Sequence, residues 1–228
     1  MKNFLRGRVE IKDSTKKKIC ELISRYPALE ICRDALNDAT EKICECFRAG
    51  HKLLICGNGG SAADSMHIVG ELMKSFLLPR SVQDFKPDFL SRAEKLFPDD
   101  ADYFKTKLQC ALPAISLVNE TALNTAFAND CDADLIFAQQ VFALGQEGDV
   151  LLAVSTSGNS KNIFYAAEVA KVLGLTTIAL TGRDGGKLKN FSDCAICAPA
   201  DSAHTIQEFH LPIYHALCIA AENELFGS

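Results

Sequence analysis

The side chains best suited to acid–base or metal chemistry gather in two stretches of the sequence. His67 and Glu71 are four residues apart within an apolar helical pattern, so one helix face presents both side chains. The stretch IQEFHLPIYH near the C-terminus adds Gln207, His210 and His215. A single helical histidine is more often a core or surface residue than a ligand. Together, however, His67, Glu71, Gln207 and His215 form a candidate ligand set for a divalent metal such as zinc.

The spacing within the C-terminal stretch limits how this set can assemble. Gln207 and His215 are eight residues apart, which is about 12 Å along a continuous helix at the standard rise and too far for easy joint coordination. Inside a helix, Pro212 would clash with the carbonyl group of Glu208, so we expect the helix to kink or restart there. The two ligands would then converge through a bend, or one of them would come from a neighbouring subunit.

Two loops have the composition of phosphate-binding sites. GNGGS at residues 57–61 follows the apolar run 52–56 and precedes a helical pattern. STSGNS at residues 155–160 follows the apolar run 149–154, and it offers four hydroxyl groups in six residues. Glycines let backbone N–H groups approach an anion, and a helix N-terminus attracts one. A single loop of this kind is equally well explained as a turn with a helix cap, but two in one chain favour a phosphate ligand, with Ser61 among the binding residues.

Composition restricts the classes of partner and the compartment. The chain has 228 residues, a net charge of −5 and 48% hydrophobic residues, which predicts a globular protein and argues against nucleic acid as a partner. No apolar run is long enough to span a bilayer, and the N-terminus lacks the apolar core of a signal peptide. Ten scattered cysteines suit buried thiols in a reducing compartment. We therefore expect a cytoplasmic protein with no membrane partner.

Apolar periodicity predicts an α/β fold with about five strands in a mainly parallel sheet between helices. The whole chain, residues 1–228, is expected to form one domain. Helices are expected at 14–25 and 28–48 within an N-terminal helical region 1–50, and at the C-terminus within 205–226. Strands are expected at 52–56, 114–118, 149–154, 176–180 and 194–198. A charged insertion at 77–112 is expected to contain two short helices broken at Pro98, as a surface excursion or, alternatively, a lid beside the site.

The motifs CGNGGSAADSMHIVGEL, AFAND, GDVLLAVSTSGNS, LTGRDGGKL and IQEFHLPIYH resemble the SIS-domain superfamily, and most closely its phosphoheptose isomerases. The resemblance covers nearly all of the chain outside the insertion. It implies a flavodoxin-like SIS domain, a cytoplasmic homotetramer with sites at subunit interfaces, and one zinc ion per subunit. It also implies isomerisation of sedoheptulose 7-phosphate to glycero-manno-heptose 7-phosphate through an enediol.

The resemblance also implies roles for individual residues. The family's zinc positions match His67, Glu71, Gln207 and His215, and Glu71 and His215 match its catalytic pair, for which we expect Glu71 as base and His215 as acid. The positions that match its sugar-phosphate site are Asn58, Gly59, Gly60, Asn129, Asp130, Ser155, Thr156, Ser157, Ser160 and Gln207, and Glu71 is expected to contact the same substrate.

Two positions depart from the family pattern, namely Ser75 in place of an arginine and His204 in place of an acidic residue. Both lie where the family holds its substrate, so they bear on which sugar is used. Two alternatives to an enzyme remain open. One is a non-catalytic SIS protein that associates with the replication initiator DnaA, although that group lacks the last histidine. The other is a phosphosugar-binding module in which no bond changes.

Overall fold

The computed structural model describes residues 10–84 and 86–227 and contains a five-stranded sheet in the order β2-β1-β3-β4-β5. All neighbouring strands are parallel. The strands are β1 (Leu53–Gly57), β2 (Ala114–Ser116), β3 (Val150–Ser155), β4 (Thr176–Thr181) and β5 (Cys194–Cys197). The expected five-stranded parallel α/β fold is confirmed, with strand ends shifted by one or two residues.

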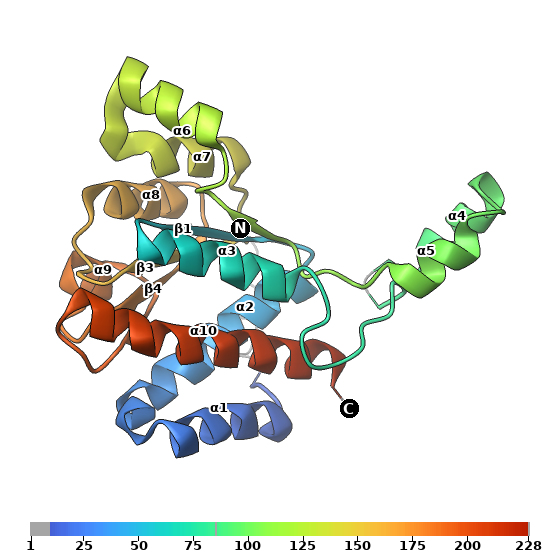
Figure 1. The fold of residues 1–228 in the computed structure, drawn as a ribbon, viewed down its shortest axis with the longest axis horizontal. Coiled ribbons are helices and arrows are strands. Elements are labelled where there is room, and N and C mark those ends of the chain that lie inside the picture. The colour runs from blue at the N-terminus through green and yellow to red at the C-terminus, as the bar shows by residue number, and fades with distance from the viewer. Residues whose placement is uncertain (1–9, 85, 228) are drawn as a thin grey trace, which may run out of the picture.

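Helices cover both faces of this sheet (Figure 1). The helices are α1 (Asp13–Arg25), α2 (Arg33–Arg48), α3 (Gly60–Leu72), α4 (Phe89–Leu96), α5 (Ala101–Lys107), α6 (Thr121–Phe127), α7 (Ile136–Leu144), α8 (Lys161–Val172), α9 (Gly186–Phe191) and α10 (Ala203–Phe226). None of the helices in the described ranges is long and apolar enough to span a bilayer.

Alternate side chains of the strands point into two apolar layers. Leu53 and Ile55 of β1 pack in the layer formed with α2, α3 and α10, whereas Leu54 and Cys56 pack in the layer formed with α7 and α8. Every residue of β1 and β3 is buried, as is typical of parallel strands covered on both sides. The sheet is therefore a rigid support for the loops at its edge.

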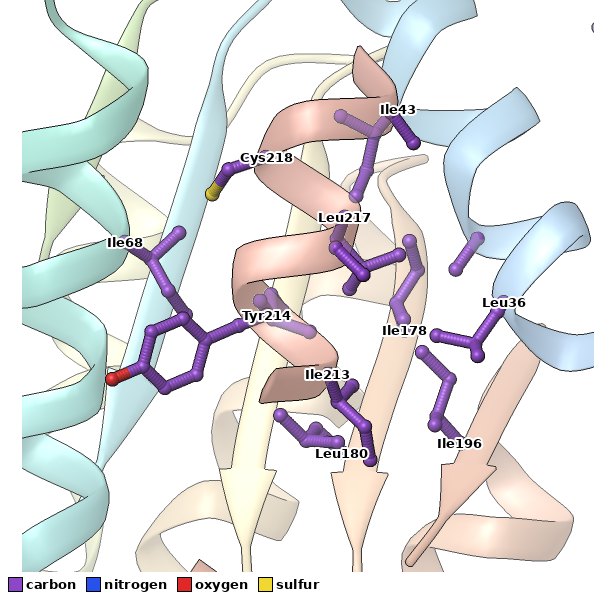
Figure 2. Close-up of a cluster of buried hydrophobic side chains, with 14 of the residues drawn as sticks. Leu36, Ile43, Ile68, Ile178, Leu180, Ile196, Ile213, Tyr214, Leu217 and Cys218 are labelled. Atoms are coloured by element: carbon purple, nitrogen blue, oxygen red, sulfur yellow. The ribbon is translucent and has the colours of Figure 1, made fainter. Parts of the chain in front are cut away.

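The C-terminal helix α10 is held against the sheet by apolar side chains. Figure 2 shows Ile213 and Leu217 of α10 packed among Ile178 and Leu180 of β4 and Leu36 of α2. Ile213 and Leu180 are both fully buried, and full burial of such a side chain stabilises a fold by about 1.5–3 kcal/mol. Packing of this kind fixes the position of α10 and of the residues that it carries.

Two local expectations near the N-terminus differ from the structure. The helix expected from Ser14 begins at Asp13, and Lys12 occupies the cap position without a side-chain hydrogen bond. The helix expected at 28–48 begins instead as a 3₁₀ helix, Pro27–Cys32, which precedes α2. Pro27 suits this starting position because it has no N–H to donate.

The expected restart at Pro212 is also wrong, because α10 is continuous from Ala203 to Phe226. A proline inside a helix removes one backbone hydrogen bond. The side chain of Pro212 is buried, as are those of Ile213 and Tyr214 beside it, and this packing outweighs the local preference to break.

The insertion forms an arm that projects away from the body of the molecule (Figure 1). Its two short helices, α4 and α5, pair with each other and are separated around Pro98, as expected. At its base, the Arg80 guanidinium group donates to Glu222 of α10 at 2.8 Å, and Leu112 N–H donates to the Leu72 carbonyl group at 3.0 Å. The arm is thus fastened where α3 ends.

Candidate functional site

The strand order places the two candidate phosphate loops side by side. The chain adds β2 to one side of β1 and then β3 to the other, so the sheet has a switch point between β1 and β3. Ligands of open parallel sheets bind at the carboxyl ends of strands at such a point. Asn58 of the first loop forms a reciprocal amide pair with Asn162 in the first turn of α8, directly after the second loop: Asn58 donates to Asn162 at 2.8 Å and Asn162 donates back at 3.0 Å. Asn162 is a site residue that the sequence does not reveal, because a single amide inside a helical pattern carries no signal of its own.

The serine-rich loop is shaped by a glycine that no other residue can replace without movement. Gly158 has a φ of +63°, and a Cβ atom there would lie 1.9 Å from the carbonyl oxygen of Gly185. The Oγ atoms of Ser155 and Ser160 lie 3.1 Å apart, while Ser157 is exposed. The loop therefore brings several hydroxyl groups to the N-terminus of α8, which attracts anions.

The glycine-rich loop is in contact with Gln207 of α10. A Cβ atom at Gly60 would lie 2.5 Å from Nε2 of Gln207, so only glycine permits this close approach. Gly59 has a φ of +57°, and Ser61 is buried in the first turn of α3. This contact places Gln207 beside the glycine-rich loop.

The second cluster lies farther along the same two helices. Nε2 of His67 lies 3.3 Å from Oε1 of Glu71 and 3.4 Å from Nε2 of His215. The Glu71 side chain is 15% exposed and also contacts the ammonium group of Lys74 at 3.1 Å. Burial, together with the neighbouring His67, lowers the pKa of His215, which favours its neutral form. A carboxylate and a neutral imidazole therefore face the same space, as acid–base chemistry requires.

The chemistry of these groups suits a divalent metal ion, but their arrangement in this structure does not close around one. Four ligands at about 2.1 Å from a tetrahedral zinc ion are about 3.4 Å from one another, close to the two separations around His67 Nε2. Within residues 10–84 and 86–227, however, no group of three or more His, Cys, Asp or Glu side chains is placed so that it could hold a metal ion. A metal site here would need rotation of Glu71 or His215, and Gln207 would still lie away from it, at Gly60.

The remaining predicted residues lie apart from these clusters. Asn129 and Asp130 are exposed in a short π-helix, Ala128–Asp132, where the Asn129 amide donates to Asp130 at 2.8 Å. Among the described residues, no hydrogen bond joins them to either loop. The backbone N–H of Ser75 donates to the Gln109 side chain at 2.8 Å, and His204 is exposed in the first turn of α10.

The cysteines in the described ranges are free thiols, Cys194 and Cys197 among them. Burial raises the pKa of Cys194 to about 12. A thiol with so high a pKa is a poor nucleophile and a poor metal ligand at neutral pH.

Sequence comparison identifies a SIS domain, whose family model matches residues 18–83 and 91–182. The chain is 37% identical over 227 residues to the phosphoheptose isomerase of Clostridium acetobutylicum, covering 100% of this chain and 97% of the relative. It is 40% identical over 195 residues to that of Helicobacter pylori, covering 86% of each chain.

Two solved structures have the same fold. The phosphoheptose isomerase of Francisella tularensis aligns with a TM-score of 0.71 and 31% identity, covering 92% of this chain and 97% of its own. That of Neisseria gonorrhoeae aligns with a TM-score of 0.69 and 31% identity, covering 92% of this chain and 98% of its own.

Proposed function

Because this chain belongs to the phosphoheptose isomerase family of SIS-domain proteins, we infer that it interconverts sedoheptulose 7-phosphate and glycero-manno-heptose 7-phosphate. Such a reaction needs a base that removes a proton from the carbon beside the carbonyl group. It also needs an acid that moves a proton between the two oxygens of the resulting enediol. We propose Glu71 as the base and His215 as the acid.

The observation that carries this assignment is the separation of the site into two ends. Gly60 and His67 are seven residues apart on α3, about 10 Å along the helix. The phosphate loops lie at the first end, and the Glu71–His67–His215 cluster lies at the second. In a heptulose 7-phosphate, the phosphate group and the reacting carbons are likewise at opposite ends of the molecule. A long sugar phosphate therefore suits the distance between the two clusters.

We assign the phosphate-loop end to substrate binding. There the backbone N–H groups at the start of α8 and the hydroxyl groups of its loop would hold the phosphate group. A neutral His215 would donate its N–H to a substrate oxygen, while Glu71 takes up the carbon-bound proton. The proposed binding residues are Asn58, Gly59, Gly60, Ser61, Glu71, Asn129, Asp130, Ser155, Thr156, Ser157, Ser160 and Gln207.

We further propose a zinc site formed by His67, Glu71, Gln207 and His215. When bound, zinc would polarise the substrate oxygens and stabilise negative charge on them. Gln207 lies at Gly60 in its own chain, about two helical turns from His215, so the amide ligand would come from a neighbouring subunit. A homotetramer with sites at subunit interfaces is part of this proposal, as is a single SIS domain. The free thiols support a reducing compartment, the cytoplasm.

The test replaces Glu71 by Gln, which keeps the shape of the side chain but removes the base. We expect turnover of sedoheptulose 7-phosphate, followed by NMR, to fall at least about 10²-fold. Binding of the sugar phosphate, followed by thermal stabilisation, should be retained. Glu94→Gln on the exposed face of α4 is the matched control and should keep full activity. Retained activity in Glu71→Gln would refute the base assignment. Stabilisation without turnover in the unmodified protein would instead favour a binding or regulatory role.

A further inference from the structure

The short connection between α3 and the arm places a cation beside the proposed catalytic base. Nζ of Lys74 lies 3.1 Å from Oε2 of Glu71, whereas Oε1 of the same carboxylate faces Nε2 of His67 at 3.3 Å. The Glu71 side chain is 15% exposed and that of Lys74 is 58% exposed. The ammonium group therefore contacts the base from its solvent-accessible side.

The backbone that follows Lys74 is anchored to the body of the protein. The N–H groups of Phe76 and Leu77 donate to the buried carboxylate of Glu222 at 2.8 and 2.7 Å. The Phe76 ring in turn contacts both sides of the cluster, because its centroid lies 5.8 Å from Nζ of Lys74 and 5.6 Å from the centroid of the His215 ring. These contacts fix the point at which the Lys74 side chain leaves the backbone, next to the acid–base cluster.

The ammonium group of Lys74 has donor capacity left for a ligand. A lysine ammonium group carries three N–H donors. Two of them are used by Oε2 of Glu71 and by the carbonyl oxygen of Ser75, which lies 3.3 Å away. Within the described part of the chain, the Lys74 side chain donates to no third acceptor. One donor therefore remains for an oxygen atom of a bound sugar, beside the proposed base.

The proposed isomerisation moves negative charge past this group. Glu71 takes the proton from the carbon beside the carbonyl group, so a C–H bond breaks and an O–H bond forms on the carboxyl group. The electron pair of the C–H bond forms the C=C bond of the enediolate, and the π pair of the carbonyl group moves onto its oxygen. The charge thus passes from the carboxylate to a substrate oxygen. A cation that touches both groups stabilises the charge where it develops.

We propose that Lys74 is a catalytic residue that donates a hydrogen bond to the substrate oxygen on which the enediolate charge develops. This inference rests on the proposed reaction and on Glu71 as its base. Removing one donor aimed at developing charge lowers kcat by about 10²–10³-fold in an enclosed site. Lys74 is more than half exposed, and solvent and salt weaken the field of an exposed charge. We therefore expect a loss of about 10-fold.

The experiment compares Lys74→Met, which removes the charge and the donors, with Lys74→Arg, which keeps both. Lys18→Met is the matched control, because it breaks a Lys18–Glu21 pair of the same three-residue spacing on α1. Turnover of sedoheptulose 7-phosphate should show kcat reduced about 10-fold in Lys74→Met. KM should be nearly unchanged, because the interaction strengthens only as charge develops. Lys74→Arg should lose less, and the control should keep full activity.

A second measurement separates this role from a structural one. The phosphorylated hydroxamate analogue of the sugar carries an ionisable group where the enediolate forms, so it mimics the charged intermediate. Calorimetry should show its affinity reduced about 10-fold in Lys74→Met. Thermal stabilisation by sedoheptulose 7-phosphate, whose carbonyl end is uncharged, should change little. Loss of a purely structural contact would weaken the binding of both ligands equally.

The outcomes separate this inference from the proposed reaction. An unchanged or increased kcat in Lys74→Met, equal losses in the Met and Arg variants, or equal weakening of both ligands would overturn the inference. None of these results would affect turnover by the unmodified protein, so the proposed reaction would stand. Absence of turnover in the unmodified protein would refute the reaction itself, and with it this role of Lys74.

Discussion

Replacing Glu222 by Gln should destabilise the fold strongly, because this carboxylate fastens the base of the arm to α10. Its oxygens accept from the backbone N–H groups of Phe76, Leu77 and Leu78 at 2.8, 2.7 and 3.0 Å. They also accept from Nε of Arg80 at 2.8 Å. The side chains of Arg80 and Glu222 are 0% and 1% exposed, so water cannot take over these hydrogen bonds.

The magnitude follows from what the substitution leaves behind. The new side-chain amide would have one accepting oxygen instead of two, and its NH₂ group would face backbone donors. The guanidinium group of Arg80 would stay buried without a counter-charge. Breaking a buried ion pair from one side costs about 3–5 kcal/mol, so we expect Glu222→Gln to reduce the free energy of unfolding by that amount.

Urea unfolding followed by circular dichroism, at one protein concentration, measures this loss. Asp201→Asn is the control, because it breaks the exposed Arg183–Asp201 pair and should cost less than about 1 kcal/mol. In a double-mutant cycle with Arg80→Met, the double variant should lose less than the sum of the single variants. A loss below about 1 kcal/mol for Glu222→Gln, or simple additivity, would show that the pair does not fasten the arm.

Two further predictions concern other parts of the fold. Burial lowers the pKa of His210 to about 4 from its usual 6.5, so between these values the unfolded chain binds the proton and the folded chain does not. Stability should therefore fall by up to about 3 kcal/mol as the pH drops from about 6.5 to about 4, and His210→Gln should flatten this dependence in urea titrations at several pH values. Gly158→Ala should destabilise the protein by more than about 1–2 kcal/mol, the cost of a positive φ alone, because its Cβ atom would also meet the Gly185 carbonyl oxygen. It should weaken sugar-phosphate binding in calorimetry, and binding unchanged from that of the unmodified protein would contradict the role of this loop.

The parts of the fold that the sequence predicts well are those where local pattern and burial agree. Residues 52–56 and 149–154 are largely apolar runs, which is what strands buried on both faces require. Each run is followed by glycine or serine and then by helical periodicity, so the position of both loops at the sheet edge follows from the chain order. The amide pair between Asn58 and Asn162 of α8 does not follow, because two isolated amides carry no periodic signal.

Pro212 is the clearest case in which tertiary packing overrides a local rule. The missing N–H and the ring of a proline predict a break, but Ile213 and Tyr214 are buried against the sheet and α3 and hold the backbone helical. The free energy gained by burying these side chains depends on the residues that they pack against. Those residues lie elsewhere in the chain, so the sequence of α10 alone does not predict this gain.

The geometry of α3 and α10 explains why Gln207 lies apart from the other candidate ligands, His67, Glu71 and His215. The first contact between these helices joins Gly60 to Gln207, and the next joins His67 to Tyr214. From the first contact to the second, each helix advances by seven residues, from Gly60 to His67 on α3 and from Gln207 to Tyr214 on α10. Equal advances in the same chain direction are expected of two helices of equal rise that lie side by side in parallel. Continuity of α10 through Pro212 therefore keeps Gln207 about two turns from His215, so this side chain cannot join the His67 cluster by a bend in the backbone.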